Sequence, residues 1–407
     1  MTRRPFARFL RWLGTIMAGY FIITTAITTT VDPWRINAAP WAINALDGAR
    51  DLYNNRRVGK AALANRGNWR VVILGSSRIE IGLDPASPVF HGRPAVNLGM
   101  SAASLYENLA VGNYALDRNP HIDTLLLGID PGDLFSDQDS RGSNHFYQSP
   151  FADNNRSIER SINQLIGWNA LVDSFGTLSR QVTGRPPRFS PLGRMQEPSG
   201  QSNLRKFVEA AFIETSVGQW SPCPELLRQA KADALTAFIH RARQAGIAMY
   251  IVIPPQHALK QIHPTKDLPA TMGWETDLLA LADICRKANA TATKGPPVQV
   301  WSFLTFNAFT CQPMPDPAAA DQSLPGWLDL GHFEPALGDR MFQTLFAAPS
   351  NSQTPPAGIN LLEGDWNTHC RAWCLAHRDY CVAHPQEVAW WRGLMARRVA
   401  KSVKAEN

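Results

Sequence analysis

A serine-containing turn after an apolar run is the first feature that could carry chemistry. Residues 70–74 (Arg-Val-Val-Ile-Leu) are typical of a buried strand, and Gly75-Ser76-Ser77-Arg78 follows them directly. Glycine permits a sharp turn after a strand, and such a turn can expose a hydroxyl beside converging backbone N–H groups. This arrangement suits a serine nucleophile with an oxyanion hole, although the same pattern also fits a plain turn with a hydroxyl cap.

An acid and a base that could activate a serine lie far downstream in the chain. Asp329 and His332 are three residues apart in the segment 327–333 (Trp-Leu-Asp-Leu-Gly-His-Phe). On one loop, this spacing lets the carboxylate fix the imidazole tautomer and stabilise the imidazolium that forms when the ring takes a proton. An isolated Asp-x-x-His is more often part of a surface loop. Its position after a Gly-x-Ser turn, with several strand–helix units between them, favours serine-based nucleophilic catalysis.

Alternating strands and helices are expected to position these groups. The predicted strands are 70–74, 124–129, 247–253 and 298–301, and the predicted helices are 104–116, 226–245 and 276–290. Ser104 and Glu107 have the spacing of a capping box at the start of the first helix. Continuous apolar strands that alternate with helices predict an α/β fold, a three-layer α/β/α sandwich with a mostly parallel sheet. Reacting groups in such folds lie just beyond the carboxyl ends of central strands.

The chain is predicted to have three parts. They are a cytoplasmic basic stub with a transmembrane anchor at 1–38, an α/β domain at 39–348, and a linker with a Cys-rich helical tail at 349–407. Within the domain, residues 39–67 are expected to form a helical connector. A polar insertion at about 131–203 is expected to lie over the carboxyl edge of the sheet, with one helix near 158–178.

Composition and charge exclude several classes of protein. Among 407 residues, 44% are hydrophobic and 18% are charged, which excludes both a disordered polyampholyte and a multispan membrane protein. The formal net charge is +6, from 40 Lys and Arg against 34 Asp and Glu, and Arg3, Arg4, Arg8 and Arg11 precede the first acidic residue. Without these arginines the remainder is nearly neutral, so nucleic-acid binding is not expected.

An uncharged run of 20 residues, 12–31, follows the N-terminal arginines. A helix of this length extends for about 30 Å, the hydrocarbon thickness of a bilayer. Basic residues before the run and Asp32-Pro33 after it predict a cytoplasmic N-terminus with the bulk of the chain outside the cytoplasm. The threonine-rich end of the run leaves a cleaved signal peptide as the alternative, but no small-x-small cleavage site closes the run. We therefore expect an uncleaved, single-pass anchor.

The tail contains cysteines and a basic helix. Cys370, Cys374 and Cys381 are interspersed with histidines, but their spacing matches no common zinc ribbon. In an oxidising compartment, disulfides among the six cysteines are expected rather than a metal site, and the sequence does not choose between the 15 pairings. Residues 388–403 form a basic amphipathic helix, which could lie on a membrane surface or pack on its own domain.

The order of several short motifs resembles one known family. The four blocks of the SGNH (GDSL-type) hydrolases are matched in order by 75–77 (Gly-Ser-Ser), 97–101 (Asn-Leu-Gly-Met-Ser), 128–130 (Gly-Ile-Asp) and 329–332 (Asp-Leu-Gly-His). A membrane-anchored bacterial branch of that family is resembled by the anchor leading into 32–34 (Asp-Pro-Trp), by 82–85 (Gly-Leu-Asp-Pro) and by 253–257 (Ile-Pro-Pro-Gln-His). That branch is similar to the periplasmic proteins of alginate O-acetylation and the extracytoplasmic D-alanylation protein of teichoic acid. The resemblance covers about residues 31–347.

The resemblance implies a role for each residue of a triad. Ser77 is the expected nucleophile, His332 the general base, and Asp329 the carboxylate that orients the base. The backbone N–H of Ser77 is one expected oxyanion donor. The donor of the second block maps onto Ala102, where the family usually has glycine.

One position departs from the family pattern. Asp130 stands where the family has an asparagine that donates its side-chain amide to the oxyanion, and an ionised carboxylate accepts but does not donate. Asn97 or Arg78 would then supply the missing donor, with Gly99 of the second block also beside the substrate. Otherwise Asp130 lies elsewhere, or the site is slow or inactive.

The resemblance implies a membrane-anchored serine acyl esterase or O-acyltransferase that acts on a cell-envelope glycan. Its place would be the bacterial inner membrane, with the main domain in the periplasm. No cofactor is expected. The expected partners are the glycan or an acyl donor, the membrane itself and, for a transferase, a multispan acyltransferase. The alternative is a catalytically weak or inactive SGNH-like module that binds polysaccharide or scaffolds an envelope assembly.

Overall fold

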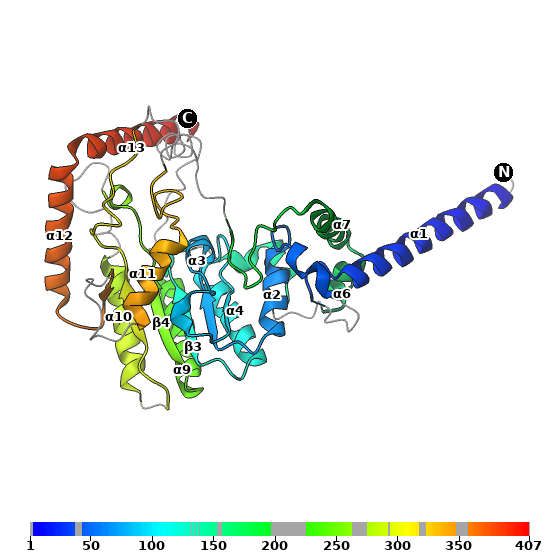
Figure 1. The fold of residues 1–407 in the computed structure, drawn as a ribbon, viewed down its shortest axis with the longest axis horizontal. Coiled ribbons are helices and arrows are strands. Elements are labelled where there is room, and N and C mark those ends of the chain that lie inside the picture. Colours follow the sequence, from blue (N-terminus) through cyan, green and yellow to red (C-terminus); the bar gives the residue numbers. More distant parts are fainter. Residues whose placement is uncertain are drawn as a thin grey trace.

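The computed structural model forms an α/β domain preceded by one long helix (Figure 1). It describes residues 3–36, 43–130, 132–134, 136–137, 139–152, 157–196, 225–262, 275–291, 294–316, 323–346 and 357–406. The α-helices are α1 (Arg3–Val31), α2 (Arg56–Arg66), α3 (Ser77–Gly82), α4 (Leu105–Arg118), α5 (Asn144–Tyr147), α6 (Ser157–Ile166), α7 (Trp168–Thr183), α9 (Glu225–Gln244), α10 (Glu275–Ala290), α11 (Pro335–Phe346), α12 (Trp366–Ala383) and α13 (Pro385–Glu406). Short 3-10 helices are η1 (Asn44–Ala49), η2 (Pro88–Phe90), η3 (Ser140–Gly142) and η4 (Ala258–Gln261).

Six strands form one mostly parallel sheet in the order β2-β1-β3-β4-β5-β6. They are β1 (Val71–Leu74), β2 (Ala95–Asn97), β3 (Thr124–Gly128), β4 (Ala248–Ile253), β5 (Gln299–Ser302) and β6 (Ile359–Asn360). The first five are parallel, and β6 pairs with β5 in the antiparallel direction. The four predicted strands are confirmed within one residue at each end. The sequence did not predict β2 and β6, because strands of three and two residues are too short for a pattern.

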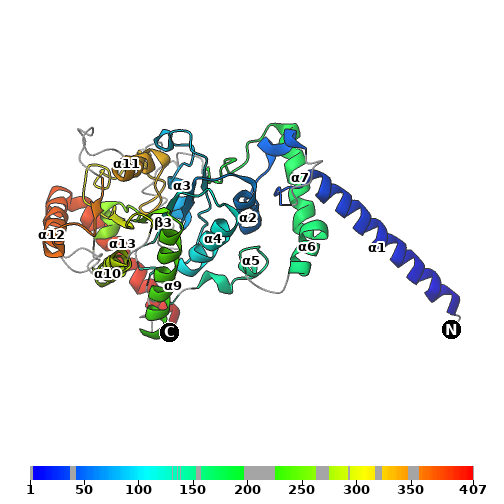
Figure 2. The same ribbon diagram turned by 90° about the horizontal axis from the view of Figure 1, so that it is seen from below.

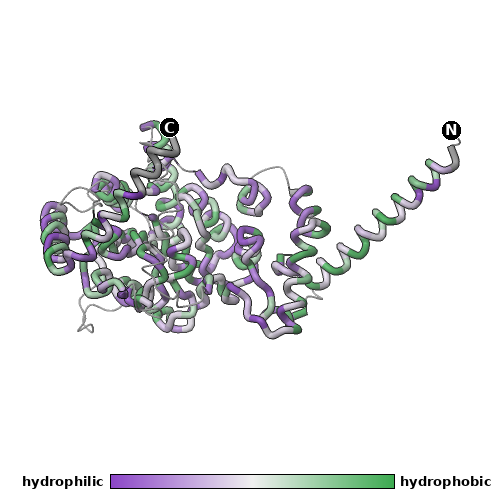
Figure 3. The backbone as a smooth tube through the Cα atoms, turned by 90° about the horizontal axis from the view of Figure 1, so that it is seen from above, coloured by the Kyte–Doolittle hydropathy of each residue, from purple (hydrophilic) through white to green (hydrophobic). Residues whose placement is uncertain are grey.

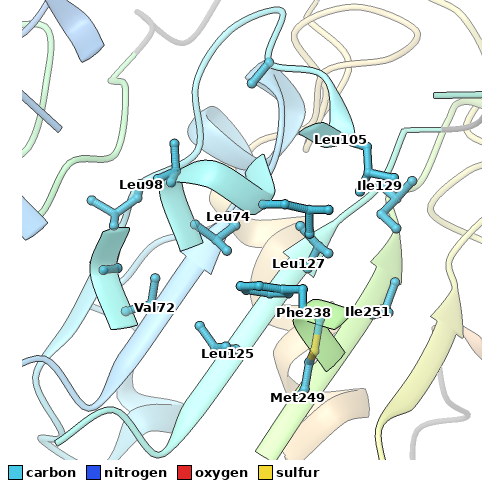
Figure 4. Close-up of a cluster of buried hydrophobic side chains, with 14 of the residues drawn as sticks. Val72, Leu74, Leu98, Leu105, Leu125, Leu127, Ile129, Phe238, Met249 and Ile251 are labelled. Atoms are coloured by element: carbon cyan, nitrogen blue, oxygen red, sulfur yellow. The ribbon is translucent and has the colours of Figure 1, made fainter. Parts of the chain in front are cut away.

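Helices cover both faces of the sheet. Successive strand residues point to opposite faces, so Leu74 and Leu127 lie on one face, where they pack with Phe238 of α9 (Figure 4) and with α4 and α10. Ile73 and Leu126 lie on the other face, where α3 and α11 pack. The central strands are buried on both faces, and helices pack on each side of the mostly parallel sheet, so the predicted α/β class is confirmed.

The strand order reverses between β1 and β3. The chain moves from β1 to β2 on one side and then crosses to β3 on the other side of β1. At such a reversal, the crevice beyond the carboxyl ends of the two strands is the usual ligand position in open α/β sheets. Ser77 comes directly after β1, and Asp130 follows β3. The fold therefore brings two of the predicted site residues to this crevice.

The polar insertion lies only partly where it was predicted. Its last part meets the carboxyl edge of the sheet, where Asn97 N donates to Leu192 O (2.9 Å) and Met195 N donates to Glu80 O (3.0 Å). Its middle forms α6 and α7, which pack beside α1 instead (Figure 2). The prediction of one helix at 158–178 was wrong, because Gly167 is extended (φ −69°, ψ 148°) and separates two helices.

A long-range contact replaces the predicted capping box of α4. Ser104 precedes the helix, but its side chain makes no capping hydrogen bond. Ser104 Oγ accepts a hydrogen bond from the Ser140 hydroxyl (2.9 Å), and Glu107 accepts two from the Arg57 guanidinium (2.6 and 2.9 Å). Both polar side chains are used by tertiary partners, so the local capping prediction was wrong.

The C-terminal tail is part of the α/β domain. β6 joins the sheet beside β5, with Ile359 opposite Ser302. Tyr380 of α12 and Trp391 and Leu394 of α13 are buried in the layer that also contains α3 and α11. Of the two interpretations of the basic helix at 388–403, packing on its own domain is the one that these buried residues support.

The N-terminal helix projects away from this domain. In Figures 1 and 2, α1 leaves the body at its C-terminal end, and α12 and α13 lie at the opposite end of the molecule. Residues 5–31 are long and apolar enough to cross a membrane, and only 6% of the most apolar window is buried. Figure 3 shows hydrophobic residues along much of this exposed helix. A signal sequence has the same length and composition, so both N-terminal predictions stay open.

Candidate active site

Two glycines bring the serine turn close to the sheet. Gly75 has a φ of +154°, and a Cβ on this residue would overlap Ile79 of α3. A Cβ on Gly128, at the end of β3, would overlap the same side chain. Ile79 thus packs in the space that both glycines leave open. This close packing lets α3 begin at Ser77, only three residues after the end of β1. Ser76 is the N-cap of this helix, and its Oγ accepts a hydrogen bond from Arg78 N (3.4 Å).

Ser77, His332 and Asp329 form one chain of hydrogen bonds. Ser77 Oγ lies 2.8 Å from His332 Nε2, and His332 Nδ1 lies 2.7 Å from Asp329 Oδ2. The other carboxylate oxygen, Oδ1, accepts from the backbone N–H groups of Gly331 (2.6 Å) and His332 (2.7 Å). Burial alone would raise the pKa of Asp329, but these hydrogen bonds and the nearby imidazole hold that pKa well below its usual range. Asp329 therefore stays ionised and can hold His332 with Nδ1 protonated and Nε2 facing the serine.

A buried histidine supports the loop that carries this acid and base. His257 N donates to Leu330 O (3.0 Å), and the ring is held by Gln312 O at Nε2 (2.8 Å) and by Leu259 N at Nδ1 (3.3 Å). Burial lowers the pKa of His257 to about 4, so the ring is neutral near pH 7. His257 is fully buried, and it supports the backbone of the loop.

A close contact between two helices fixes the loop relative to the serine. α11 begins three residues after His332, and a Cβ on its Gly338 would overlap the carbonyl oxygen of Gly82, the last residue of α3. A Cβ on Gly82 would in turn overlap the ring of Phe333. The helix that starts at Ser77 and the segment that follows His332 therefore pack so closely that neither Gly82 nor Gly338 has room for a side chain.

This contact gives a stability prediction with a matched control. Gly338→Ala should lower the free energy of unfolding by about 3 kcal/mol, because the new methyl group has to push α11 away from α3. Gly393→Ala is the control: it lies in helix α13 with nothing within 4 Å of the added Cβ, so it should raise stability by about 0.5–1 kcal/mol. Chemical unfolding of the full chain in detergent measures both. Equal shifts in the two variants would contradict the contact.

The loop after β2 offers one backbone donor. Met100 N donates to Gly75 O (2.8 Å), Ser101 N to Glu80 Oε2 (3.1 Å) and Ala103 N to Met100 O (3.1 Å). Ala102 has a left-handed backbone (φ +59°), and its N–H has no hydrogen-bond acceptor among the residues that the structure describes. Within this loop, Ala102 is therefore the residue whose N–H is available to a ligand.

Two of the other predicted donors are already occupied. The Asn97 side-chain amide donates to Ile79 O and Leu83 O (both 2.9 Å), at the end of α3. Its Oδ1 accepts from Gly99 N (2.9 Å), so neither the Asn97 amide nor the Gly99 N–H is left for an oxyanion. The sequence-based suggestion that Asn97 could replace the missing donor was wrong. Asn97 is fully buried and holds the loop against α3 instead.

Asp130 is paired with a cation. Its Oδ1 lies 3.4 Å from Arg78 Nη1, and both side chains are largely shielded from solvent. Arg78 also lies against the loop of the acid and base, since a Cβ on Gly331 would be 3.6 Å from its Nε. The same Cβ would be 2.6 Å from Nζ of Lys260, a residue that no sequence pattern singled out. The negative charge of Asp130 is thus offset beside the site, and Arg78 remains the candidate for an additional donor.

A buried cluster of charged side chains connects α3 to α2. Glu80 is fully buried, accepts from Arg56 Nη1 (3.1 Å) and the Ser101 hydroxyl (2.8 Å), and lies 3.6 Å from Lys60 Nζ. Lys60 donates to Asn97 O (2.8 Å) and Gly193 O (2.5 Å). Burial lowers the pKa of Lys60 to about 8. The segment predicted as a helical connector therefore supplies α2, which contacts both α3 and the loop after β2 that contains Ala102. No sequence signal marked these charges as buried.

The cysteines that the structure describes do not form the predicted disulfides. No disulfide joins any two of Cys285, Cys311, Cys370, Cys374 and Cys381, and Cys223 lies outside the described residues. Cys285 is buried in α10 and Cys381 contacts the His377 ring. Among the described residues, no group of three His, Cys, Asp or Glu side chains converges as metal ligands.

This is therefore an α/β protein in which Ser77, His332 and Asp329 form a chain of hydrogen bonds. The chain lies at the point where the strand order of the sheet reverses. Comparison of the chain with protein-family models, with curated proteins and with solved structures found no match of any of the three kinds.

Proposed function

We propose that this protein is a serine acyl esterase or O-acyltransferase of the SGNH type. The observation that carries the proposal is the continuous contact from Ser77 Oγ to His332 Nε2 (2.8 Å) and from His332 Nδ1 to Asp329 Oδ2 (2.7 Å). A nucleophile within hydrogen-bond reach of its base, with the base oriented by a third group, is the geometry that acyl transfer through serine requires. A three-layer fold and the order of the four sequence blocks also support it.

The reaction proceeds in two halves. His332 takes the Ser77 proton while Oγ attacks the ester carbonyl carbon, and the imidazolium then gives that proton to the departing alcohol as the C–O bond breaks. This leaves the acyl group on Ser77. Water or a sugar hydroxyl, deprotonated by His332, attacks the acyl-enzyme and restores the serine. Water as acceptor makes the protein an esterase, and a glycan hydroxyl makes it a transferase.

Backbone and cationic groups would stabilise the tetrahedral oxyanion. Ser77 is the first residue of α3, so its N–H has no partner within the helix. The Ala102 N–H is the second candidate donor. Arg78 takes the place of the family's asparagine: its guanidinium, 3.4 Å from Asp130, offsets that acidic charge and can donate to a developing oxyanion. Preorganised donors of this kind supply on the order of 10²–10³ in rate each.

The location and the substrate rest on the N-terminus and on the family resemblance. α1, whose N-terminal part contains four arginines before its uncharged run, supports a single-pass anchor in the bacterial inner membrane, with the α/β domain in the periplasm. A cell-envelope glycan as acceptor, and a multispan acyltransferase that delivers the acyl group, are what the resemblance implies.

A second candidate is a non-catalytic module that binds polysaccharide or scaffolds an envelope assembly. Asp130 favours it, because an acidic residue stands where a neutral donor is usual. The short Ser77–His332 distance favours catalysis, since a binding module has no need to keep a base 2.8 Å from a serine hydroxyl.

A fluorophosphonate probe distinguishes the two candidates. The full chain in detergent should be labelled on Ser77, as mapped by peptide mass spectrometry, because the probe reacts only with an activated serine. His332→Ala should remove the label while the thermal unfolding profile stays close to that of the original chain. The whole chain is used because the end of α1 packs on the body, where Arg50 donates to Asp32 O (2.8 Å) and Val31 O (2.6 Å). A folded chain that takes no label would favour the binding module.

A further inference from the structure

Helix α7 turns its polar side toward the protein and its apolar side outward, the reverse of an ordinary surface helix. Asp173, Ser174 and Thr177 are buried, whereas Trp168 and Phe175 are 68% and 54% exposed. A helix of a soluble domain normally turns its apolar stripe toward the core. Here the apolar stripe has no protein against it among the described residues, and the polar stripe faces the body.

The buried polar side of α7 is a built feature. Asp173 Oδ2 accepts hydrogen bonds from Trp34 Nε1 (2.8 Å) and Asn55 Nδ2 (2.9 Å), and Oδ1 accepts from Asn54 Nδ2 (2.6 Å). The Thr177 hydroxyl donates to the carbonyl of Asp173 itself (2.9 Å). The three hydrogen bonds that Asp173 accepts fix the rotation of α7, so the helix cannot turn its apolar stripe inward without breaking them.

Helix α6 repeats the same arrangement. Arg160 points inward and donates to Ser149 O (3.1 Å) and Ala152 O (2.8 Å). Ile158 and Ile162, in the first and second turns of α6, are exposed on the side away from Arg160. We call the exposed apolar residues of both helices the α6–α7 face: Ile158, Ile162, Trp168, Val172, Phe175, Leu178 and Val182.

The α6–α7 face continues onto the helix that is apolar enough to cross a membrane. Both helices pack against the C-terminal part of α1 (Figures 1 and 2), where the Thr28 hydroxyl meets Leu165 O. α1 is also inverted at this end: Thr24 and Thr28 are buried against α6 and α7, whereas Ile22 and Ile23 point outward. Three adjacent helices therefore turn polar groups toward the protein and apolar groups away from it.

We propose that the α6–α7 face lies in the lipid bilayer that α1 crosses, within the leaflet on the side of the α/β domain. This rests on the proposal that α1 is a membrane anchor and not on the serine chemistry. Outward apolar and inward polar faces are what a hydrocarbon solvent selects, and amphipathic helices enter the boundary between headgroups and acyl chains. α7 has 16 residues and is about 24 Å long, too short to cross a bilayer of about 30 Å, so it lies in one leaflet.

The embedded face would hold the domain at a fixed orientation. A single α1 helix would let the domain swing, whereas a second attachment through α7 restricts it. α2 links this attachment to the candidate active site, because Asn54 and Asn55 at its start hold Asp173 of α7 while Lys60 at its centre contacts Glu80 of the serine helix. The site would thus be presented at one height above the membrane surface, which suits an acyl donor or a glycan that is held at that surface.

Photocrosslinking in the full chain tests this inference. p-Benzoylphenylalanine replaces Phe175 or Val182 on the α6–α7 face, and the protein is reconstituted in vesicles of phosphatidylethanolamine and phosphatidylglycerol. Ile16 of α1 is the positive control. The matched negative control is Val382, which is apolar, helical and 74% exposed. It belongs to α12, and Figure 1 shows this helix at the far end of the molecule from α1. Lipid adducts are counted by mass spectrometry after irradiation.

We expect lipid adducts at Phe175 and Val182 in yields at least about tenfold above Val382, because an interfacial helix buries its apolar face among acyl chains. Adducts at Ile16 but not at Phe175 or Val182 would overturn the inference and leave the anchor standing. Adducts at none of these positions would show that α1 itself is not in the membrane. A crosslink between two protein chains at Phe175 would assign the face to a second copy instead. Fluorophosphonate labelling of Ser77 reports on the serine chemistry separately in every variant.

Discussion

Ser77→Ala is expected to lower the hydrolysis of p-nitrophenyl acetate by the full chain about 10⁴-fold or more. The hydroxyl that forms the acyl-enzyme is removed, and triad serines act as part of a unit whose loss eliminates most of the catalysis. The fold should be kept, since the side chain makes one hydrogen bond to a partly exposed ring and losing it costs about 1 kcal/mol. Initial rates and thermal unfolding are measured on the same preparation.

The neighbouring serine is the matched control for this change. Ser76→Ala removes a hydroxyl one residue away that serves as the N-cap of α3 through its bond from Arg78 N (3.4 Å). It should cost about 1 kcal/mol of stability and change the rate less than about tenfold. Full turnover in folded Ser77→Ala would remove Ser77 from the mechanism. An equal loss in both variants would show that the turn, and not the Ser77 hydroxyl, matters.

Asp329→Asn is expected to lower the same rate about 10⁴-fold, because an amide facing His332 Nδ1 favours the wrong imidazole tautomer. In that tautomer Nε2 carries the proton and points it at Ser77, so the ring can no longer accept a proton from the serine. The loop should keep its shape, since the remaining side-chain oxygen still accepts from Gly331 N (2.6 Å) and His332 N (2.7 Å). The rate of fluorophosphonate labelling measures the effect on the first half of the reaction directly.

The same substitution at the other acid of the site gives the control. Asp130→Asn removes an identical charge but should raise the labelling rate, by about tenfold, because it removes a carboxylate beside the developing oxyanion and releases Arg78 to donate. Losses of similar size at Asp329 and Asp130 would mean that the site needs negative charge in general, and the tautomer argument would fail. A loss at Asp130 alone would assign that carboxylate a part in catalysis.

A site on short segments needs support that local sequence does not provide. Here α3 has only six residues, yet it is fixed by Ile79 against two glycines, by Gly82 against α11 and by Glu80 against α2. The Asp329 loop is likewise held by His257 and by the start of α11. The serine and the acid–base pair therefore come from separate parts of the chain, and the packing of three helices keeps the distances between them short.

Sequence alone determined the parts of this protein that depend on local patterns. The apolar runs that became β1, β3 and β4 could be found because strands buried on both faces are mostly apolar, and β5 was found from the run 298–301 although it contains Gln299. The helical segments could be found from the helical spacing of their apolar residues, and the N-terminal run could be found from its length without charge. The residues Ser77, Asp329 and His332 were identified by their order and by the family that they resemble.

Tertiary structure decided everything that depends on which distant groups meet. Asn97 was expected to donate to substrate but satisfies the end of α3, and Ser104 and Glu107 bind Ser140 and Arg57 rather than capping α4, because buried polar groups take the partners that the fold supplies. The tail joins the sheet through a strand of two residues, too short to have a pattern. The direction in which α7 faces is the clearest case: its sequence shows an apolar stripe, but only the hydrogen bonds to Asp173 turn that stripe away from the protein.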